Sequence, residues 1–384
     1  MPSIVIVAAK RTVQGRFLGS LAKQSAVDLA VAAGRATLEG IDPAHIDQVI
    51  VGNVLAAGQG MNIARQIGVK LNIPIDKPAF TVNMMCASGL QAVMLAAQAV
   101  RAGEAGAVLC GGTESMSNAP YLLDRARRGY KLGDGVLVDC LLRDGLVDSF
   151  DDEHMGLNTE RLADEYKLSR EQQDAFAVQS QSRYQQAHQE DVFANERVSV
   201  AGLAHDEHPR ADTTAQALAQ LKPAFRADGS VTAGNAAGIN DGAAMLLVCD
   251  DTTAQGHGWQ PLARLVGWTS VGCDPQRMGL GPVHATRQLC DRHGWNLSRF
   301  DSIELNEAFA AQTLACLNEM NLAPNAPHVN ASGGAIAMGH PIGASGARLV
   351  AHLCHRLAAG RARHGLATLC VGGGMGVAAA LDAV

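Results

Sequence analysis

The 384-residue sequence contains few aromatic and few charged side chains. Aromatic residues make up 4% of the chain and charged residues 18%, whereas hydrophobic residues make up 47%. The chain is too long for one ordinary domain, so two or three folding units are expected. Their cores must be built from alanine, valine, leucine and isoleucine, which suits helices packed on buried parallel strands.

Features of several other protein classes are also missing. The net charge is −6 and no long basic run occurs, so nucleic acid is not an expected partner. No apolar run reaches the length of a membrane-spanning helix. The first residues, MPSIVIVAAKRT, lack the parts of a signal peptide, and the last, AAALDAV, carry no peroxisomal or retention signal. We therefore expect a cytoplasmic protein that binds no membrane.

The cysteines do not form a recognisable metal or disulfide pattern. Their number, nine, is odd, and no CxxC pair occurs. Most are expected to be buried small hydrophobic residues of a reduced protein. Cys86 and Cys370 stand in unusual surroundings and need another explanation.

Hydrophobic runs and helical periodicity predict strands that alternate with helices in both the first and the last third of the chain. Such alternation is typical of an α/β fold with a parallel sheet. The expected strands are residues 3–8, 48–54, 79–82, 107–110, 243–249, 263–271, 302–305 and 367–371. The expected helices are residues 25–38, 62–71, 88–102, 286–293, 307–318 and 345–360.

The middle of the chain has a different character. It contains a charged, irregular stretch at 121–153, a polar helical region at 158–195 and a loop at 200–214. We interpret residues 117–241 as an inserted domain. Residues 1–116 with 242–262 then form a first half, and residues 263–384 form a second half.

The two halves contain similar patterns. Ala87-Ser88-Gly89, an apolar helix and then LCGG in the first half correspond to Ala344-Ser345-Gly346, an apolar helix and then LCVGG in the second. This echo suggests two similar units that pack face to face. A site between them would collect residues from both.

His340 lies in the most unusual stretch, NASGGAIAMGHPIGASGA at 330–347, which has five glycines and no charge. Backbone so rich in glycine turns tightly and lets another group approach closely. We expect His340 to be held there as a base, although a loop histidine bonded to backbone is the alternative.

Cys86, in NMMCASGL, lies where an expected strand meets an expected helix. Free backbone N–H groups and the helix dipole at such a place favour a thiolate. This position suits a nucleophile that His340 activates. A cysteine filling a gap at the start of a helix would give the same pattern.

Cys370 ends an expected strand and precedes Gly372, Gly373 and Gly374. Consecutive glycine N–H groups can cradle an oxyanion or a phosphate. A buried strand thiol is the alternative for Cys370. A dinucleotide loop is not expected, because these glycines do not form GxGxxG.

Two further residues could belong to a site. Asn306 follows an expected strand and could either cap the next helix or aim its amide into the site. His154, in the irregular EHMG, is another candidate.

Taken together, these motifs resemble those of the thiolase family, and the bacterial-type acetyl-CoA C-acetyltransferases within it. The resemblance covers essentially the whole chain. The matching stretches are NMMCASGLQAV (83–93), GGTESMSNAPY (111–121), HMG (154–156), KPAFRADGSVTAGNAAGINDGAA (222–244), NEAFAAQ (306–312), NASGGAIAMGHPIGASGAR (330–348) and CVGGGMGVA (370–378).

The resemblance implies a five-layer αβαβα sandwich of two similar halves with an inserted loop domain. It implies that Cys86 is the acylated nucleophile, His340 its base, and Cys370 the acid and base for the α-proton. Asn306, through a water, and His340 would form one oxyanion hole. The N–H groups of Cys86 and Gly372 would form the second.

The implied activity is the reversible Claisen condensation of two acetyl-CoA molecules, or thiolysis of a 3-ketoacyl-CoA. The implied partners are thus acetyl-CoA and 3-ketoacyl-CoA. Coenzyme A is substrate and product, and no metal or redox cofactor is implied. The family also implies a homotetramer, with residues 122–138 in the region that joins dimers.

The resemblance implies a further set of contacts with coenzyme A and the acyl group. The residues are His154, Met155, Arg210, Phe225, Ala233, Ala237 and Phe309. Ala237 stands where the family often has a serine that contacts pantetheine, and Ala217 also replaces a common serine. These departures leave the preferred acyl chain open.

Three alternatives remain. A 3-ketoacyl-CoA thiolase for longer chains would share all of the catalytic residues. A β-ketoacyl-carrier-protein synthase has a related fold but would lack a base like Cys370. A non-catalytic acyl-CoA-binding or lipid-transfer protein would be expected to lack Cys86 or His340.

Overall fold

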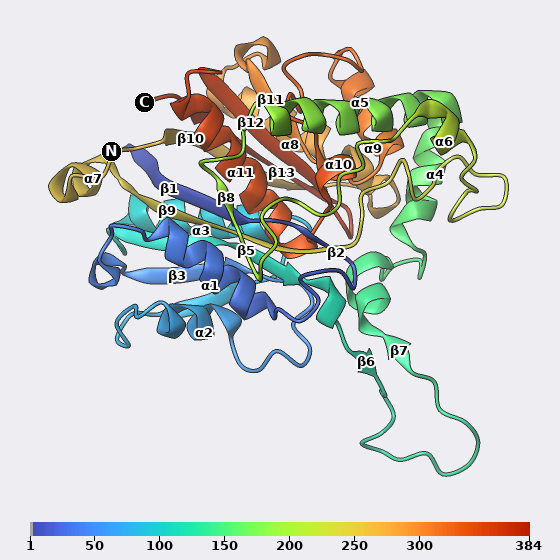
Figure 1. Ribbon diagram of the computed structural model, residues 1–384, viewed down its shortest axis with the longest axis horizontal. Coiled ribbons are helices and arrows are strands. Elements are labelled where there is room, and N and C mark those ends of the chain that lie inside the picture. The colour runs from blue at the N-terminus through green and yellow to red at the C-terminus, as the bar shows by residue number, and fades with distance from the viewer. Residues whose placement is uncertain (1–2) are drawn as a thin grey trace.

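The structure, a computed structural model, describes residues 3–384 as a mixed α/β protein (Figure 1). The strands are β1 (Ile4–Thr12), β2 (Gly15–Arg16), β3 (Gln48–Gly52), β4 (Ala79–Val82), β5 (Ala107–Ser115), β6 (Tyr121–Leu122), β7 (Val138–Asp139), β8 (Arg197–Val198), β9 (Asn240–Asp250), β10 (Ala263–Gly272), β11 (Ser302–Leu305), β12 (His364–Val371) and β13 (Met375–Asp382). The helices are α1 (Ala26–Thr37), α2 (Ile63–Lys70), α3 (Ser88–Ala102), α4 (Met155–Glu165), α5 (Arg170–Gln189), α6 (Ala215–Ala219), α7 (Asp251–His257), α8 (Gly281–His293), α9 (Ala310–Glu319), α10 (Ala335–Met338) and α11 (Ile342–Ala358). No helix in this part of the chain is both long and apolar enough to cross a membrane.

The strand order repeats itself on the two sides of one long sheet. The first half has the order β1-β9-β5-β3-β4, and the second has β10-β13-β12-β11. At the edge of the second half, Val329 forms an isolated parallel bridge with Ile303 of β11. This bridge occupies the position that β4 has beside β3 in the first half. The halves meet where β1 pairs antiparallel with β10 through Val5–Arg264 and Ile6–Ala263. The echo in the sequence is therefore a repeat in the topology.

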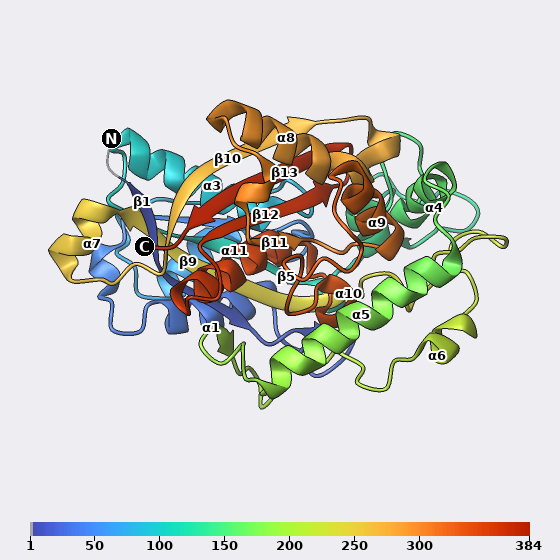
Figure 2. The ribbon, with the colours of Figure 1, turned by 90° about the horizontal axis from the view of Figure 1, so that it is seen from above.

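The helices complete five layers (Figures 1 and 2). α1 and α2 cover the outer face of the first half-sheet, and α8 and α9 cover that of the second. α3 and α11 lie between the half-sheets, and their side chains share one core with residues of β5, β9, β12 and β13. The predicted αβαβα sandwich is confirmed.

Small residues let the two central helices approach closely. A Cβ atom on Gly89 of α3 would lie 2.9 Å from the backbone nitrogen of Ala347 in α11. A Cβ on Gly346 of α11 would lie 2.7 Å from the Cβ of Leu90. Backbones this close tolerate no larger side chain without a shift. The Ala-Ser-Gly repeats found in the sequence thus mark the contact between the halves.

Between β5 and β9 the chain leaves the sheet and returns to it only at β8, which pairs with β1. β6 and β7 form a two-stranded ribbon that extends away from the body, with residues 123–137 at its tip (Figure 1). α5 lies across the second half (Figure 2). Arg11 of β1 ties this excursion to the sheet through buried ion pairs with Glu196, at 2.6 Å, and Asp206, at 2.7 Å.

Several predicted boundaries are wrong. The polar region at 158–195 is two helices, because Lys167 has a φ of 53° and Ser169 caps α5 with a capping box. The helix expected at 307–318 begins only at Ala310. α8 begins five residues earlier than expected, at Gly281, with a proline in its first turn. β13 was not predicted, because its alanine-rich sequence has little strand propensity.

Candidate active site

One cavity of about 520 Å³ collects residues from both halves and from the excursion. Its size suits a small ligand. Eleven of the twelve residues expected at the site line it: Cys86, His154, Met155, Arg210, Phe225, Ala233, Ala237, Phe309, His340, Cys370 and Gly372. The twelfth, Asn306, is buried with its Nδ2 3.5 Å from Nε2 of His340. All of the sequence candidates therefore lie together.

Cys86 is held by a tight turn between β4 and α3. Met85 adopts a left-handed φ of 47°, which is uncommon for a residue other than glycine. The hydroxyl of Ser88 accepts a hydrogen bond from the N–H of Met84 at 2.9 Å and donates one to the carbonyl of Met85 at 2.6 Å. This turn presents the Cys86 sulfur to the cavity just before the helix begins.

The Cys86 thiol is neutral in the free protein, which corrects the expectation of a thiolate. Burial raises the pKa of Cys86 to about 11, and the carboxylate of Glu114 adds to the increase. Hydrogen bonds from the N–H groups of Gly372 and Cys86 itself to the sulfur act in the opposite direction. Desolvation therefore outweighs the helix dipole here.

We expect alkylation of Cys86 by iodoacetamide to be slow at pH 7 in the free protein. The thiolate is the reactive form, so below the pKa of about 11 the rate should rise nearly tenfold per pH unit. Rates of modification of the Cys86 peptide, followed by mass spectrometry from pH 7 to 9.5, would check this. A plateau below pH 8 would instead mean a preformed thiolate.

His340 is fixed from both sides. Its backbone N–H lies 3.2 Å from the carbonyl oxygen of Gly238 and 3.2 Å from Oδ1 of Asn240. The preceding Gly339 has a φ of 100°, and a Cβ there would lie 2.2 Å from Cγ of Asn240. This glycine is therefore required for the close approach that the sequence suggested.

A hydrogen-bond chain selects the tautomer of His340. The hydroxyl of Ser345, one turn into α11, donates to the carbonyl of Pro341 at 3.0 Å. Its oxygen lies 2.6 Å from Nδ1 of His340, so Nδ1 carries the proton that it shares with Ser345. Nε2 is then left with a lone pair. Burial, helped by the charge of Arg348, lowers the pKa of His340 to about 3, which keeps the ring neutral and able to accept a proton.

Asn306 lies beside His340, and the next residue, Glu307, holds the glycine-rich stretch by hydrogen bonds. Asn306 does not cap a helix, because α9 begins at Ala310 with Phe309 at its N-cap. The buried carboxylate of Glu307 accepts hydrogen bonds from Ser180 at 2.7 Å, from Asn330 at 2.8 Å and from the N–H of Ile336 at 3.1 Å. The Asn306 amide, which caps no helix, lies beside His340.

Cys370 lies near the end of β12, with 1% of its surface exposed. Burial raises its pKa well above the usual value, and the neighbouring Cys86 adds to the effect. The two thiols line the same cavity. A neutral thiol at this position can donate a proton, and its conjugate thiolate would be a strong base.

The outer wall of the cavity belongs to the excursion. The ring of His154 stacks on that of Phe225 with centroids 4.6 Å apart, and Phe225 meets Phe309 edge-on at 6.2 Å. Gly156 makes room for Phe225, since a Cβ there would lie 2.4 Å from that ring. These rings give the cavity a largely apolar wall.

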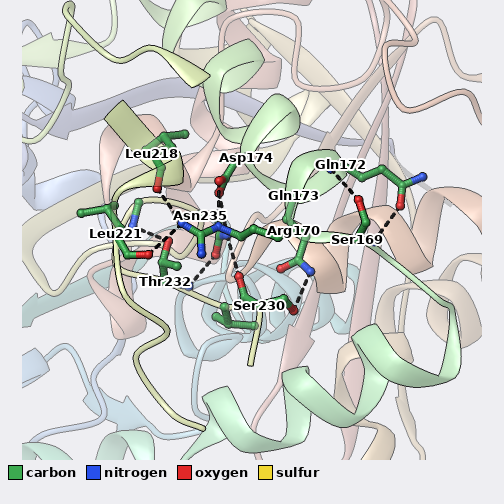
Figure 3. Close-up of polar contacts among 12 residues, drawn as sticks. Ser169, Arg170, Gln172, Gln173, Asp174, Leu218, Leu221, Ser230, Thr232 and Asn235 are labelled. Carbon is green, nitrogen blue, oxygen red and sulfur yellow. Dashed lines mark hydrogen bonds and ion pairs between the residues drawn. The ribbon is translucent and has the colours of Figure 1, made fainter. Parts of the chain in front are cut away.

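A polar network fixes the segment that carries Ala233 and Ala237 (Figure 3). Asn235 donates to Oδ1 of Asp174 in α5 at 2.9 Å and to the carbonyl of Ser230 at 3.1 Å. Asp174 also pairs with Arg170 at 2.7 Å. The segment is joined to the second half where the N–H of Ala237 donates to the carbonyl of Ala308 at 2.9 Å.

Sequence reasoning missed some residues that shape the site. Ser345, which orients His340, was noticed only as part of the repeat. Glu114 is fully buried and accepts hydrogen bonds from Asn53, from the N–H groups of Val54 and Leu55, and from the N–H of Gly343. It thereby joins the two halves behind Cys86, and burial raises its pKa to about 7. No local pattern marks such a residue, because its partners are distant in the sequence.

Comparison with known families accounts for nearly the whole chain. Residues 4–252 match the model of the thiolase N-terminal domain, and residues 259–383 match that of the thiolase C-terminal domain. An acetyl-CoA acetyltransferase of Pseudomonas aeruginosa is 49% identical, with 99% of each chain covered. An acetyl-CoA acetyltransferase of Escherichia coli K12 is 48% identical, with 100% of this chain and 99% of the other covered.

Solved structures agree with this picture. Human mitochondrial 3-ketoacyl-CoA thiolase in complex with CoA superimposes with a TM-score of 0.97 at 40% identity, covering 100% of this chain and 98% of the other. The Bacillus anthracis acetyl-CoA acetyltransferase superimposes with a TM-score of 0.96 at 39% identity, covering 100% and 99%. Both fold and sequence are therefore shared along the full length.

Proposed function

Because the chain belongs to the thiolase family, we propose that it is an acetyl-CoA acetyltransferase that interconverts two acetyl-CoA molecules and acetoacetyl-CoA plus coenzyme A. The observation that carries this proposal is one cavity lined by Cys86, His340 and Cys370. The N–H of Gly372 bonded to the Cys86 sulfur, and Asn306 beside Nε2 of His340, support it.

In thiolysis, His340 first accepts the proton of Cys86 as the sulfur attacks the 3-keto carbon. The carbon–carbon bond then breaks, which leaves an acyl group on Cys86 and an enolate of acetyl-CoA. Cys370 donates its proton to the α-carbon of that enolate, and acetyl-CoA departs. The covalent intermediate divides one difficult reaction into two easier ones.

The second stage restores the enzyme. The Cys370 thiolate accepts the proton of an incoming coenzyme A thiol, whose sulfur attacks the acyl group on Cys86. Cys86 leaves as a thiolate and regains its proton from the His340 imidazolium. Run in reverse, the same steps condense two acetyl-CoA molecules. Every proton is accounted for within the three side chains, so we propose that no metal or redox cofactor is needed.

Two groups of donors would hold the developing oxyanions. The N–H groups of Cys86 and Gly372 would face the oxygen of the acyl group on Cys86. The Asn306 amide, through a water, and the His340 imidazolium would face the enolate oxygen. Preorganised donors of this kind commonly contribute about 100-fold or more to the rate.

The acyl-chain profile of thiolysis tests the substrate assignment. We expect kcat/KM to be highest for acetoacetyl-CoA and to fall by about tenfold or more for 3-ketoacyl-CoA substrates of eight or more carbons. Rates for a series from four to sixteen carbons, with saturating coenzyme A, would show this. Equal or higher values for the long substrates would favour a 3-ketoacyl-CoA thiolase with a broad chain preference. The identity of 48–49% to the acetyl-CoA acetyltransferases of Pseudomonas aeruginosa and Escherichia coli supports the short chain.

We also propose that the protein is a homotetramer in the cytoplasm. Residues 117–241 would form an inserted domain that takes part in the contacts between subunits. The ribbon of β6 and β7 supports the assembly, because its tip exposes large apolar side chains. Leu132 is 99% exposed and Val136 73% exposed. Exposed apolar groups on an extended ribbon are typical of contacts between subunits.

A further inference from the structure

His208 is a cavity residue to which no role has been given. Its side chain lines the cavity, and its imidazole makes no hydrogen bond to any residue in the range 3–384. Nδ1 is enclosed by protein without a partner. Nε2 is therefore the nitrogen left to meet a ligand. Since no group within residues 3–384 pairs Nε2 either, a polar ligand atom in the cavity can form the hydrogen bond that Nε2 lacks.

The ring is built into the wall rather than placed loosely at its edge. It packs on Gly238, where a Cβ would lie 2.0 Å from Cε1 of His208. The backbone around it is held on both sides. The N–H of Glu207 donates to the carbonyl of Gln14 at 2.8 Å, and the N–H of Arg210 donates to Oε1 of Gln181 at 2.9 Å.

His208 lies between the catalytic residues Cys86 and His340 and the mouth of the cavity. Gly238, on which the ring packs, accepts the backbone N–H of His340 through its carbonyl. On the outer side, the exposed Arg16 and Arg210 also line the cavity. A thioester of coenzyme A that reaches Cys86 must lay its pantetheine arm along this stretch.

The protonation state of His208 suits a neutral polar partner. Burial, with the charges of Arg210 and Arg16, lowers its pKa to about 4. A neutral imidazole carries one N–H, which Nε2 can donate while Nδ1 keeps the lone pair. Two other polar groups of the cavity each have one protein partner. Nδ1 of His154 accepts from Gly156, and the hydroxyl of Thr232 accepts from Gly234.

We propose that His208 is a specificity-determining residue whose Nε2–H donates to the carbonyl of the pantetheine amide farther from the sulfur. The inference rests on the proposed use of coenzyme A thioesters. It also supplies a polar contact in a cavity where Ala237 has no hydroxyl to offer. His208 thus lets the enzyme distinguish full pantetheine thioesters from truncated ones.

A truncation series tests the proposal with His208→Phe, which keeps the ring and removes both nitrogens. The substrates are acetoacetyl-CoA, acetoacetyl-pantetheine and acetoacetyl-N-acetylcysteamine, the last of which lacks the farther amide. We expect kcat/KM to fall about fivefold to tenfold for the first two, with kcat within twofold of wild type. For the third substrate we expect less than a twofold change. His208→Gln, whose amide nitrogen can reach the position of Nε2 and keeps an N–H donor, should recover part of the loss.

Other outcomes overturn the proposal. A loss confined to acetoacetyl-CoA would place the contact on the phosphates, and an equal loss with all three substrates would place it elsewhere. The matched control is His205→Phe, an exposed histidine on the same segment, which should behave as wild type. Thermal unfolding of each variant checks the fold. Wild-type protein that does not thiolyse acetoacetyl-CoA would refute the proposed function instead, independently of any effect at His208.

Discussion

Replacing Cys86 with serine is expected to lower the rate of acetoacetyl-CoA thiolysis by at least about 1,000-fold. Sulfur is the better nucleophile, and the neutral His340 can remove a proton from a thiol far more easily than from an alcohol. The side chain changes by one atom, so the cavity should keep its shape. Binding of coenzyme A, measured by calorimetry, should therefore change by less than about threefold.

A second readout locates the covalent intermediate. After brief exposure of wild-type protein to acetyl-CoA, mass spectrometry of its peptides should show one acetyl group, on Cys86. The serine variant should carry none on the same timescale. Near-normal thiolysis by the variant, or an acetyl group on another wild-type residue, would contradict the assignment of the nucleophile.

Replacing Cys370 with alanine is expected to separate the two stages of the reaction. Without its acid and base at the α-carbon, condensation and thiolysis should both fall by about 1,000-fold. Acetylation of Cys86 should fall much less, because His340 remains in place and coenzyme A can depart as a thiolate without the proton of Cys370. Steady-state rates in both directions, together with acetylation of Cys86 by acetyl-CoA, would test this.

Exchange of the α-hydrogens of acetyl-CoA with deuterated water gives an independent measurement of the Cys370 step. It should be lost in Cys370→Ala and retained in Cys316→Ala, the matched control. Cys316 is also a buried thiol near Cys370, but it donates to the carbonyl of Gly279 at 3.0 Å. Normal condensation by Cys370→Ala would refute the role of this thiol.

The regular parts of the fold could be predicted because their signals are local. The apolar run of β9 and the small residues of α3 and α11 carry the layered architecture in their own sequence. The Ala-Ser-Gly repeat indicated two similar units that pack face to face. Local patterns supplied Cys86, His154, Asn306, His340 and Cys370 as candidates, and resemblance to a family added the others. All but Asn306, which lies beside His340, line one cavity.

The features that sequence reasoning missed depend on distant partners. Asn306 could be interpreted as a cap because nothing local shows that α9 begins only at Ala310. The expectation of a thiolate at Cys86 did not include desolvation, which raises the pKa of the thiol and depends on the whole fold. Ser345 can reach His340 only because α11 begins at Ile342 rather than near Ser345 itself.

The position of α11 has a consequence for how the protein is made. Cys86 precedes α3, whereas His340 immediately precedes α11, and the two helices share one core. During synthesis the inner face of the first half stays exposed until α11, which packs against it, has left the ribosome. Contacts so distant in sequence form late in folding. We therefore expect reactivity toward thioesters only in the fully folded chain, and none in an incomplete chain that already carries Cys86.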